Sequence, residues 1–208
     1  MNYRHGFHAG NHADVLKHVV LLAICDALAA MPAPCFALDT HGGRGRYKLD
    51  AEAALRTGEA ASGVGKLGTA RSPAIARYTA ALAACRAAHG NNAYPGSPWL
   101  LKHALRPQDR IVACELHPDE AAWLKTNFLD DPQVSVQERD GYAAMKALLP
   151  PRGGDGARIA RGLVLIDPPY EAQLEEFDTA LAALRELADA LGEDGRGDWR
   201  LDWLRAPP

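Results

Sequence analysis

The chain has few cysteines, and they are not arranged to hold a metal or a disulfide framework. Cys25, Cys35, Cys85 and Cys114 are its four cysteines in 208 residues, and no two of them form a C-x-x-C pair. Widely spaced single thiols are typical of reduced core positions in an intracellular protein. The sequence therefore predicts neither a zinc ribbon nor a disulfide scaffold.

The chain also lacks a hydrophobic run that could cross a membrane. Its longest apolar stretch, residues 15–31, contains Lys17, His18 and Asp26 and follows no basic segment. A signal peptide needs such a basic segment, and a membrane helix needs about 20 apolar residues without charges. We expect a soluble, cytoplasmic protein without membrane contacts.

A strong net charge is absent as well. The formal charge is −3 and the sequence pI is about 6.2, which does not by itself indicate a nucleic-acid-binding protein. Basic residues exceed acidic ones only within residues 1–48, where five Lys and Arg accompany three Asp. Any contact with phosphate is therefore expected near the amino-terminal end.

The most informative stretch is Leu163–Tyr170, which reads L-V-L-I-D-P-P-Y. Its four apolar residues predict a central parallel strand that is covered on both faces. The two prolines end the strand because they supply no N–H to the hydrogen-bond ladder. Asp167 and Tyr170 are then left at the carboxyl edge of the sheet, where open α/β sheets bind ligands.

An acid followed by two prolines and an aromatic residue suits chemistry on the amine of a base. The Asp167 carboxylate and the Pro168 carbonyl can both accept hydrogen bonds from one exocyclic NH₂ group, which makes its lone pair available for attack. Tyr170 offers a flat face for stacking a base that is unpaired or flipped out of its helix. The alternative is an ordinary turn in which Asp167 only caps the strand end.

Three further strands are predicted, and each ends in an acid or leads into one. They are Cys35–Asp39, Ile111–Glu115 and Val134–Gln137, the last followed by Asp140. The first runs into a glycine-rich turn, residues 40–47, where the backbone could approach a ligand closely. Glu115 could bond both ribose hydroxyls of an adenosine, and Asp140 could meet an adenine amine or cap the next helix. We predict a doubly wound sheet with the order third, second, first, fourth.

The segments between these strands are predicted to be helical. A first helix begins after Asn11 as N-cap and carries His18, which could point at a ligand or cover the helix. A long helix begins at Ser72-Pro73, and Ser97 is interpreted as the cap of a short helix to Leu105. We divide the chain into residues 1–48, an inserted helical subdomain at 49–106, the rest of the α/β domain at 107–191, and a tail at 192–208.

Histidines are concentrated near the amino terminus, where five of the eight precede residue 42. His8 and His12 are four residues apart, which is a spacing that metal ligands use. No carboxylate or thiolate completes a set with them, so we predict no metal site.

The chain closely resembles the RlmJ-type 23S ribosomal RNA adenine-N6 methyltransferases over residues 1 to about 175. The motifs that carry the resemblance are Y-R-H at 3–5, F-H-A-G-N-H-A-D-V-L-K-H at 7–18, L-D-T-H at 38–41, G-R-Y at 45–47, Y-P-G-S-P at 94–98, E-L-H-P at 115–118, D-G at 140–141 and L-I-D-P-P-Y-E at 165–171. The resemblance implies a Rossmann-like class I methyltransferase fold that uses S-adenosylmethionine, with 23S ribosomal RNA as the substrate.

The resemblance also implies roles for individual residues. Asp167 would be the catalytic acceptor, and Tyr3 would lie against the substrate adenine. The expected cofactor-binding residues are His18, His41, Ser97, Glu115, Asp140 and Gly141. The helical insertion would face the RNA. Separately from the resemblance, we expect a correctly folded chain to be a monomer.

The carboxyl-terminal end departs from the family pattern. A helix is predicted from Leu174 to Leu191, and Trp199–Pro208 match no motif of the family, whose members continue with further strands. We therefore expect a truncated or frameshifted chain. Two alternatives to an RNA adenine methyltransferase remain: a DNA adenine or RNA guanine methyltransferase, and an inactive relative that only binds the cofactor or RNA.

Overall fold

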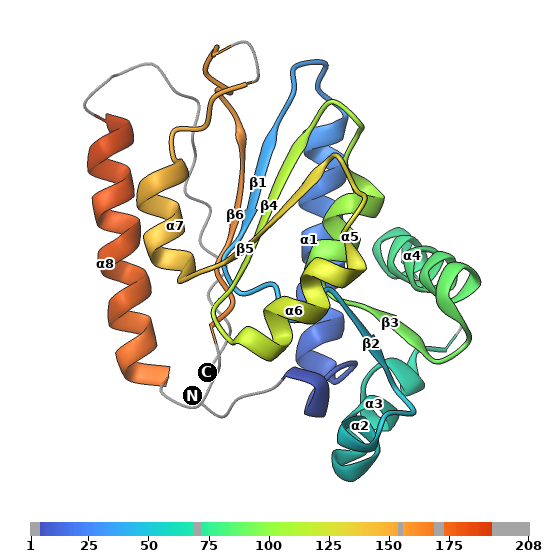
Figure 1. Ribbon diagram of the computed structural model, residues 1–208. Coiled ribbons are helices and arrows are strands. Elements are labelled where there is room, and N and C mark those ends of the chain that lie inside the picture. Colours follow the sequence, from blue (N-terminus) through green and yellow to red (C-terminus); the bar gives the residue numbers. More distant parts are fainter. Residues whose placement is uncertain (1–4, 69–71, 154–155, 169–172, 193–208) are drawn as a thin grey trace.

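A four-stranded parallel sheet forms the centre of the protein in a computed structural model, which describes residues 5–68, 72–153, 156–168 and 173–192 (Figure 1). The strands of this sheet, in spatial order, are β5 (Val134–Glu138), β4 (Arg110–Glu115), β1 (Phe36–Asp39) and β6 (Gly162–Leu165). This order is the predicted third, second, first, fourth. The α/β class and the doubly wound arrangement are thus confirmed.

Helices cover both faces of this sheet. The longer helices of the described residues, whether or not they touch this sheet, are α1 (His12–Ala29), α4 (Pro73–His89), α5 (Ser97–Ala104), α6 (Pro118–Asn127), α7 (Gly141–Leu148) and α8 (Gln173–Gly192). The shorter ones are η1 (His5–Phe7), α2 (Glu52–Thr57), α3 (Glu59–Ser62) and η2 (Val64–Lys66). None of the helices in the described ranges is long and apolar enough to cross a membrane.

The alternation of side chains along β1 builds two hydrophobic layers. Ala37 faces a cluster that includes Leu22 of α1 and Leu101 of α5, whereas Leu38 faces a cluster that includes Met145 of α7. Successive residues of a strand point to opposite faces, so a four-residue strand serves both layers. Figure 1 shows the result, with α1 and α5 on one side of the sheet and α7 and α8 on the other.

Side-chain caps set where several helices begin. The Asn11 side chain accepts a hydrogen bond from the Asp14 N–H at the start of α1, as predicted, and the Ser72 side chain accepts one from the Ile75 N–H at the start of α4. The interpretation of Ser97 as a cap was wrong, because Gly96 is the N-cap and Ser97 is the first residue of α5. A serine inside the first turn has a side chain that is available for another partner.

The segment predicted as a helical insertion also contains a strand. β3 (Ala93–Pro95) pairs antiparallel with β2 (Arg46–Lys48), which follows the glycine turn, and this two-stranded sheet was not predicted. Both α4 and α5 pack against α1. The division at residues 49 and 106 stays a prediction.

β6 is an edge of the four strands that the structure describes, because it pairs only with β1 there. Leu163 and Leu165 pack on the α1 layer, and Val164 packs on the α7 layer. An edge strand that is apolar on both faces offers unpaired N–H and C=O groups to another chain. We therefore predict that the polypeptide 1–208 self-associates and has low thermal stability. Sedimentation velocity at several concentrations measures this, and a single monomeric species throughout would contradict it.

Candidate functional site

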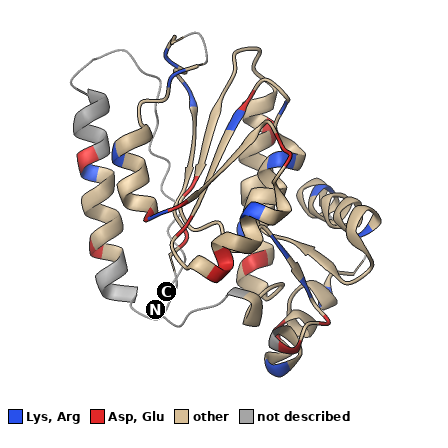
Figure 2. Ribbon diagram, viewed as in Figure 1, with Lys and Arg blue, Asp and Glu red and all other residues tan. Residues whose placement is uncertain are grey.

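Acidic residues from all four parallel strands lie at one edge of the sheet. Asp39 is the last residue of β1 and Glu115 the last of β4, while Asp140 and Asp167 each follow their strand by two residues. Figure 2 shows acidic positions at the lower ends of the central strands, in the orientation of Figure 1. Because the strands are parallel, their carboxyl ends necessarily meet at this edge.

Asp39 is the most strongly perturbed group of the site. Its side chain is fully buried, and its Oδ1 accepts a hydrogen bond from the His41 N–H at 3.2 Å. Burial raises the pKa of the carboxyl group to about 7, although the Ser97 hydroxyl and the His41 N–H act to lower it. The Ser97 hydroxyl does not satisfy Oδ2, which is buried without a hydrogen-bond partner in the described part of the chain. Such an orphaned carboxylate oxygen is a rare and costly arrangement.

Lys17 connects α1 to this edge and was not predicted as a functional residue. Its ammonium group forms an ion pair with Asp167 and lies 3.2 Å from Oδ1 of Asp14. Asp14 is itself buried, and its Oδ2 accepts a hydrogen bond from the Gly10 N–H at 2.9 Å. The pair of Lys17 and Asp167 spans 150 residues of sequence. Its only signal in the sequence is the place of Lys17 within the F-H-A-G-N-H-A-D-V-L-K-H motif.

The glycine-rich turn after β1 is fastened to β4. The Gly42 N–H donates to the Cys114 carbonyl at 2.7 Å, and the Gly43 N–H donates to Oε2 of Glu115 at 2.9 Å. The other oxygen of Glu115 accepts from the His117 N–H at 2.8 Å. Burial raises the pKa of Glu115, and the backbone N–H groups oppose that rise. Gly43 has φ +55°, and a side chain there would meet the Tyr47 hydroxyl.

A second close approach brings the start of α7 against the end of β1. A Cβ atom at Gly141 would lie 2.3 Å from the Thr40 carbonyl oxygen, so only glycine fits. Next to this contact the rings of His41 and Tyr142 meet edge to face, with their centroids 5.5 Å apart. Asp140 is exposed and caps α7 through the Ala143 N–H at 2.7 Å. Of its two predicted roles, capping the helix is therefore the one observed.

His18 and Ser97 lie differently with respect to this edge. His18 is buried, and its Nδ1 lies 3.2 Å from the hydroxyl of Tyr94, which also accepts a hydrogen bond from Tyr78. These contacts give His18 a structural role in the protein interior. Ser97 is half-buried and acts on Asp39, as described above. The predicted cofactor contacts of both residues stay predictions.

Two predicted substrate residues, Tyr3 and Tyr170, lie outside the described residues. Within the described ranges, no group of three or more His, Cys, Asp and Glu is arranged to hold a metal ion. His8, half of the possible metal pair, instead contacts Oε1 of Glu59 at 2.9 Å. Glu59 also accepts a hydrogen bond from Asn11, which fastens the amino-terminal segment to α3.

Comparison with known proteins decides the family. The family described as "Ribosomal RNA large subunit methyltransferase D, RlmJ" matches residues 32–204. The chain belongs to this family. The match to the RlmJ family continues past residue 175, where the motifs alone had placed the end of the resemblance.

Two curated relatives carry the name ribosomal RNA large subunit methyltransferase J. The chain is 42% identical to the Haemophilus influenzae protein over 191 residues and 41% identical to the Escherichia coli protein over 180 residues. These matches cover 89% and 84% of the chain, but only 65% and 61% of the two relatives. The chain thus spans less than two thirds of their length.

A solved structure agrees with this assignment. A crystal structure of a Legionella pneumophila protein is 33% identical and superimposes with a TM-score of 0.70, covering 87% of this chain and 65% of the other. The fold at the acidic edge is therefore that of RlmJ-type proteins. The family is named for a methyltransferase, and methyltransferases use a methyl donor.

Replacing Asp39 with asparagine should stabilise the fold as the pH rises. A carboxyl group whose folded pKa is about 7, against about 3.9 when unfolded, destabilises the fold progressively as the pH rises between those values. The neutral amide of Asp39→Asn would not carry this penalty, so the advantage of the variant should grow by about 1–3 kcal/mol between about pH 5 and pH 8. Chemical denaturation of wild type and Asp39→Asn at both pH values measures it. A difference that does not change with pH would contradict the assigned pKa.

Proposed function

We propose that this chain methylates the exocyclic N6 amine of an adenine in 23S ribosomal RNA, with S-adenosylmethionine as the methyl donor. The observation that carries the proposal is the position of Asp167. It follows β6, which pairs in parallel with β1, in a D-P-P-Y motif, and it lies at the same edge of the sheet as the buried Asp39. The RNA substrate is proposed because both RlmJ relatives are named as ribosomal RNA methyltransferases. This activity would place the chain in the cytoplasm.

The residues of the edge fit S-adenosylmethionine by their chemistry. The cofactor carries an ammonium group, a ribose diol and an adenine ring, and it supplies an electrophilic methyl group. Asp39 has a buried oxygen without a partner in the described part of the chain, which suits a positively charged donor. Glu115 accepts one backbone hydrogen bond on each oxygen and keeps lone pairs for the diol. His41 and Tyr142 provide ring surface, and Asp140 and Gly141 precede Tyr142 at the start of α7.

Asp167 would hold the accepting amine. Its carboxylate and the Pro168 carbonyl would each accept one N–H of the adenine NH₂ group, so that the nitrogen lone pair turns out of conjugation and attacks the methyl carbon. As the new N–C bond forms, the bond between that methyl carbon and the donor's sulfonium sulfur would break to leave a neutral thioether, and the nitrogen would give up one proton to solvent. In this structure Lys17 pairs with Asp167, so the incoming amine must share or replace that ion pair. Tyr170 and Tyr3 are proposed to contact the base.

The test of this function is tritiated-methyl transfer to unmodified 23S RNA fragments, followed by nucleoside analysis. N6-methyladenosine in the digested RNA is the expected product. Methyl transfer to DNA or to guanine would instead identify one of the alternative methyltransferases. Cofactor binding without methyl transfer to any of these substrates would identify an inactive relative.

Asp167→Ala should abolish methyl transfer and leave the affinity for S-adenosylmethionine within a few-fold of wild type. The lost hydrogen bond is made to the accepting amine, so its removal lowers turnover selectively. Single-turnover kinetics and calorimetry measure the two quantities separately. Asp167→Asn retains an acceptor oxygen and should keep partial activity. Normal turnover in the alanine variant would remove Asp167 from the mechanism.

Glu115→Ala should weaken cofactor binding by about 1.5–3 kcal/mol, the range for hydrogen bonds to a charged group. Part of the loss would come from the glycine turn, which Glu115 fastens. Glu138→Ala is a matched control, because Glu138 ends the neighbouring strand but is exposed and pairs with Lys125 at 2.6 Å. His41→Ala and Ser97→Ala should cause smaller losses. Calorimetry that shows equal affinity for the Glu115 and Glu138 variants would exclude the ribose role.

A further inference from the structure

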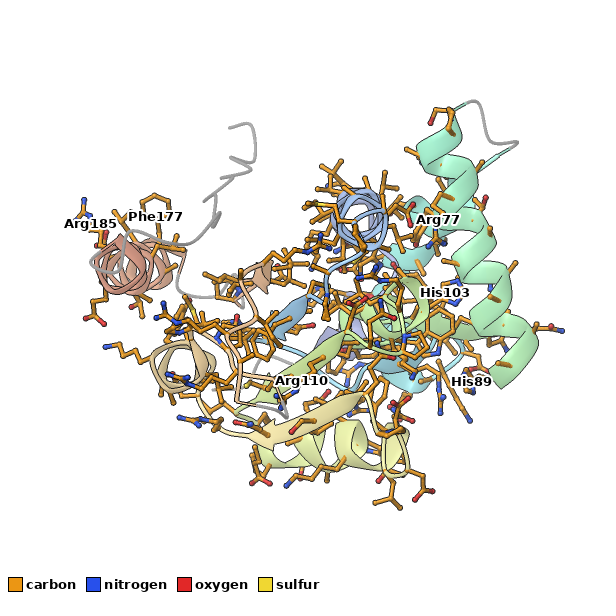
Figure 3. All side chains as sticks on the ribbon, turned by 90° about the horizontal axis from the view of Figure 1, so that it is seen from above. Arg77, His89, His103, Arg110, Phe177 and Arg185 are labelled. Atoms are coloured by element: carbon orange, nitrogen blue, oxygen red, sulfur yellow. The ribbon has the colours of Figure 1, made fainter. Side chains whose placement is uncertain are left out.

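Five cationic and aromatic side chains form a continuous row beside α4 and α5, which we call the Trp99 strip. Its members are Arg77, His103, Trp99, His89 and Arg46. The rings of Trp99 and His103 stack at 4.9 Å between centroids with an angle of 15°, and the Trp99 indole N–H lies 3.3 Å from Nε2 of His89. Nη1 of Arg46 lies 2.9 Å from Nδ1 of His89. Figure 3 shows Arg77, His103 and His89 following one another along the length of α4.

The strip contains more hydrogen-bond donors than acceptors at His89. A neutral imidazole has one N–H donor and one acceptor nitrogen. Both ring nitrogens of His89 nevertheless face donors, the guanidinium of Arg46 and the indole of Trp99. In either tautomer, therefore, one of the two contacts places the N–H of His89 opposite another N–H donor. An anionic oxygen placed between these groups would supply the missing acceptor.

The electrostatic environment of the strip is positive. Burial and the neighbouring Arg46 lower the pKa of His89, and burial and Arg77 lower that of His103. Arg77 is paired with Asp26 at 3.1 Å. In the described part of the chain, the other four members of the strip make no contact with a carboxylate. The charge of Arg46, whose other contact is the neutral Asn127 amide, is therefore available to an anionic partner.

The strip is joined to the acidic edge through the backbone. Arg46 lies near the end of the glycine turn, only seven residues after Asp39, so the two are at most about 25 Å apart even along an extended chain. The Gly96 N–H donates to the Gly45 carbonyl at 2.9 Å and fixes the start of α5, which carries Trp99, to this turn. A polymeric substrate that occupies the edge could thus extend along the strip.

We propose that the Trp99 strip binds the RNA strand that flanks the target nucleotide, and this inference rests on the function proposed above. A phosphate would lie between Arg46, His89 and Trp99, where the acceptor is missing. An unpaired base would stack on the exposed face of His103, which Trp99 supports from behind. A positive groove with stacking rings is the usual way in which proteins hold single-stranded nucleic acid. An acidic peptide would use the charge but would leave the ring platform without a partner.

The test compares strip variants by RNA binding and by steady-state methyl transfer to the same 23S RNA fragment. His103→Ala is the first variant, because His103 is exposed and its removal leaves the core intact. Trp99→Ala and Arg46→Gln follow, each checked for unchanged thermal unfolding. Arg185→Gln is the matched control on α8, which packs on the opposite face of the sheet (Figure 3).

Each strip variant should raise the KM for RNA and the dissociation constant by roughly tenfold, the scale of one lost stacking contact. The affinity for S-adenosylmethionine and kcat at saturating RNA should not change. Arg46→Gln should also lower the slope of log affinity against log salt by about one, because one phosphate contact is lost. Arg185→Gln should match wild type.

Two results would overturn the inference in distinguishable ways. Strip variants with wild-type KM and salt dependence would show that the RNA does not lie here, while the proposed methyl transfer stands. A wild-type chain that binds and methylates no RNA would remove the proposed function, and the inference with it.

Discussion

The parallel pairing of β1 with β4 and β6 is the constraint on which the site depends. Asp39 lies level with Ala113 on one side and Leu165 on the other, so the ends of the three strands are fixed relative to one another. Parallel strands need crossover connections, and those connections leave the functional turns at the carboxyl edge. β1 has only four residues, but its register is fixed on both sides. This register brings the glycine turn, Glu115 and Asp167 to the same edge of the sheet.

The burial of Asp39 lowers the stability of the fold and favours the binding of a positively charged ligand. A buried carboxylate without a full set of hydrogen bonds lowers the stability of the folded protein, and burial raises the pKa of Asp39 to about 7. The same unsatisfied oxygen would gain a hydrogen bond and a favourable charge interaction when a positively charged ligand binds. Strained or unsatisfied groups are retained mainly at functional sites, where this exchange is useful.

The sequence was sufficient for the features that depend on local pattern. Apolar runs that end in acids located the four strands, and Asn11 and Ser72 marked the starts of two helices, because these signals lie within a few residues. Pairings between distant residues could not be read in this way. β2 and β3 are three-residue strands separated by α2, α3, η2 and α4, and Lys17 reaches Asp167 across 150 residues. Ser97 was misread because the N-cap of α5 lies one residue earlier, at Gly96.

The double attachment of Glu115 has a consequence for the thermodynamics of binding. Its carboxylate holds the glycine turn and the start of α6 in place through Gly43 and His117, two contacts made within the protein itself. The conformational entropy of that turn is therefore lost when the protein folds, not when the cofactor binds. A rigid turn of this kind favours a rapid, nearly rigid-body association. The enthalpy of cofactor binding should then report the contacts themselves, with little contribution from ordering the loop.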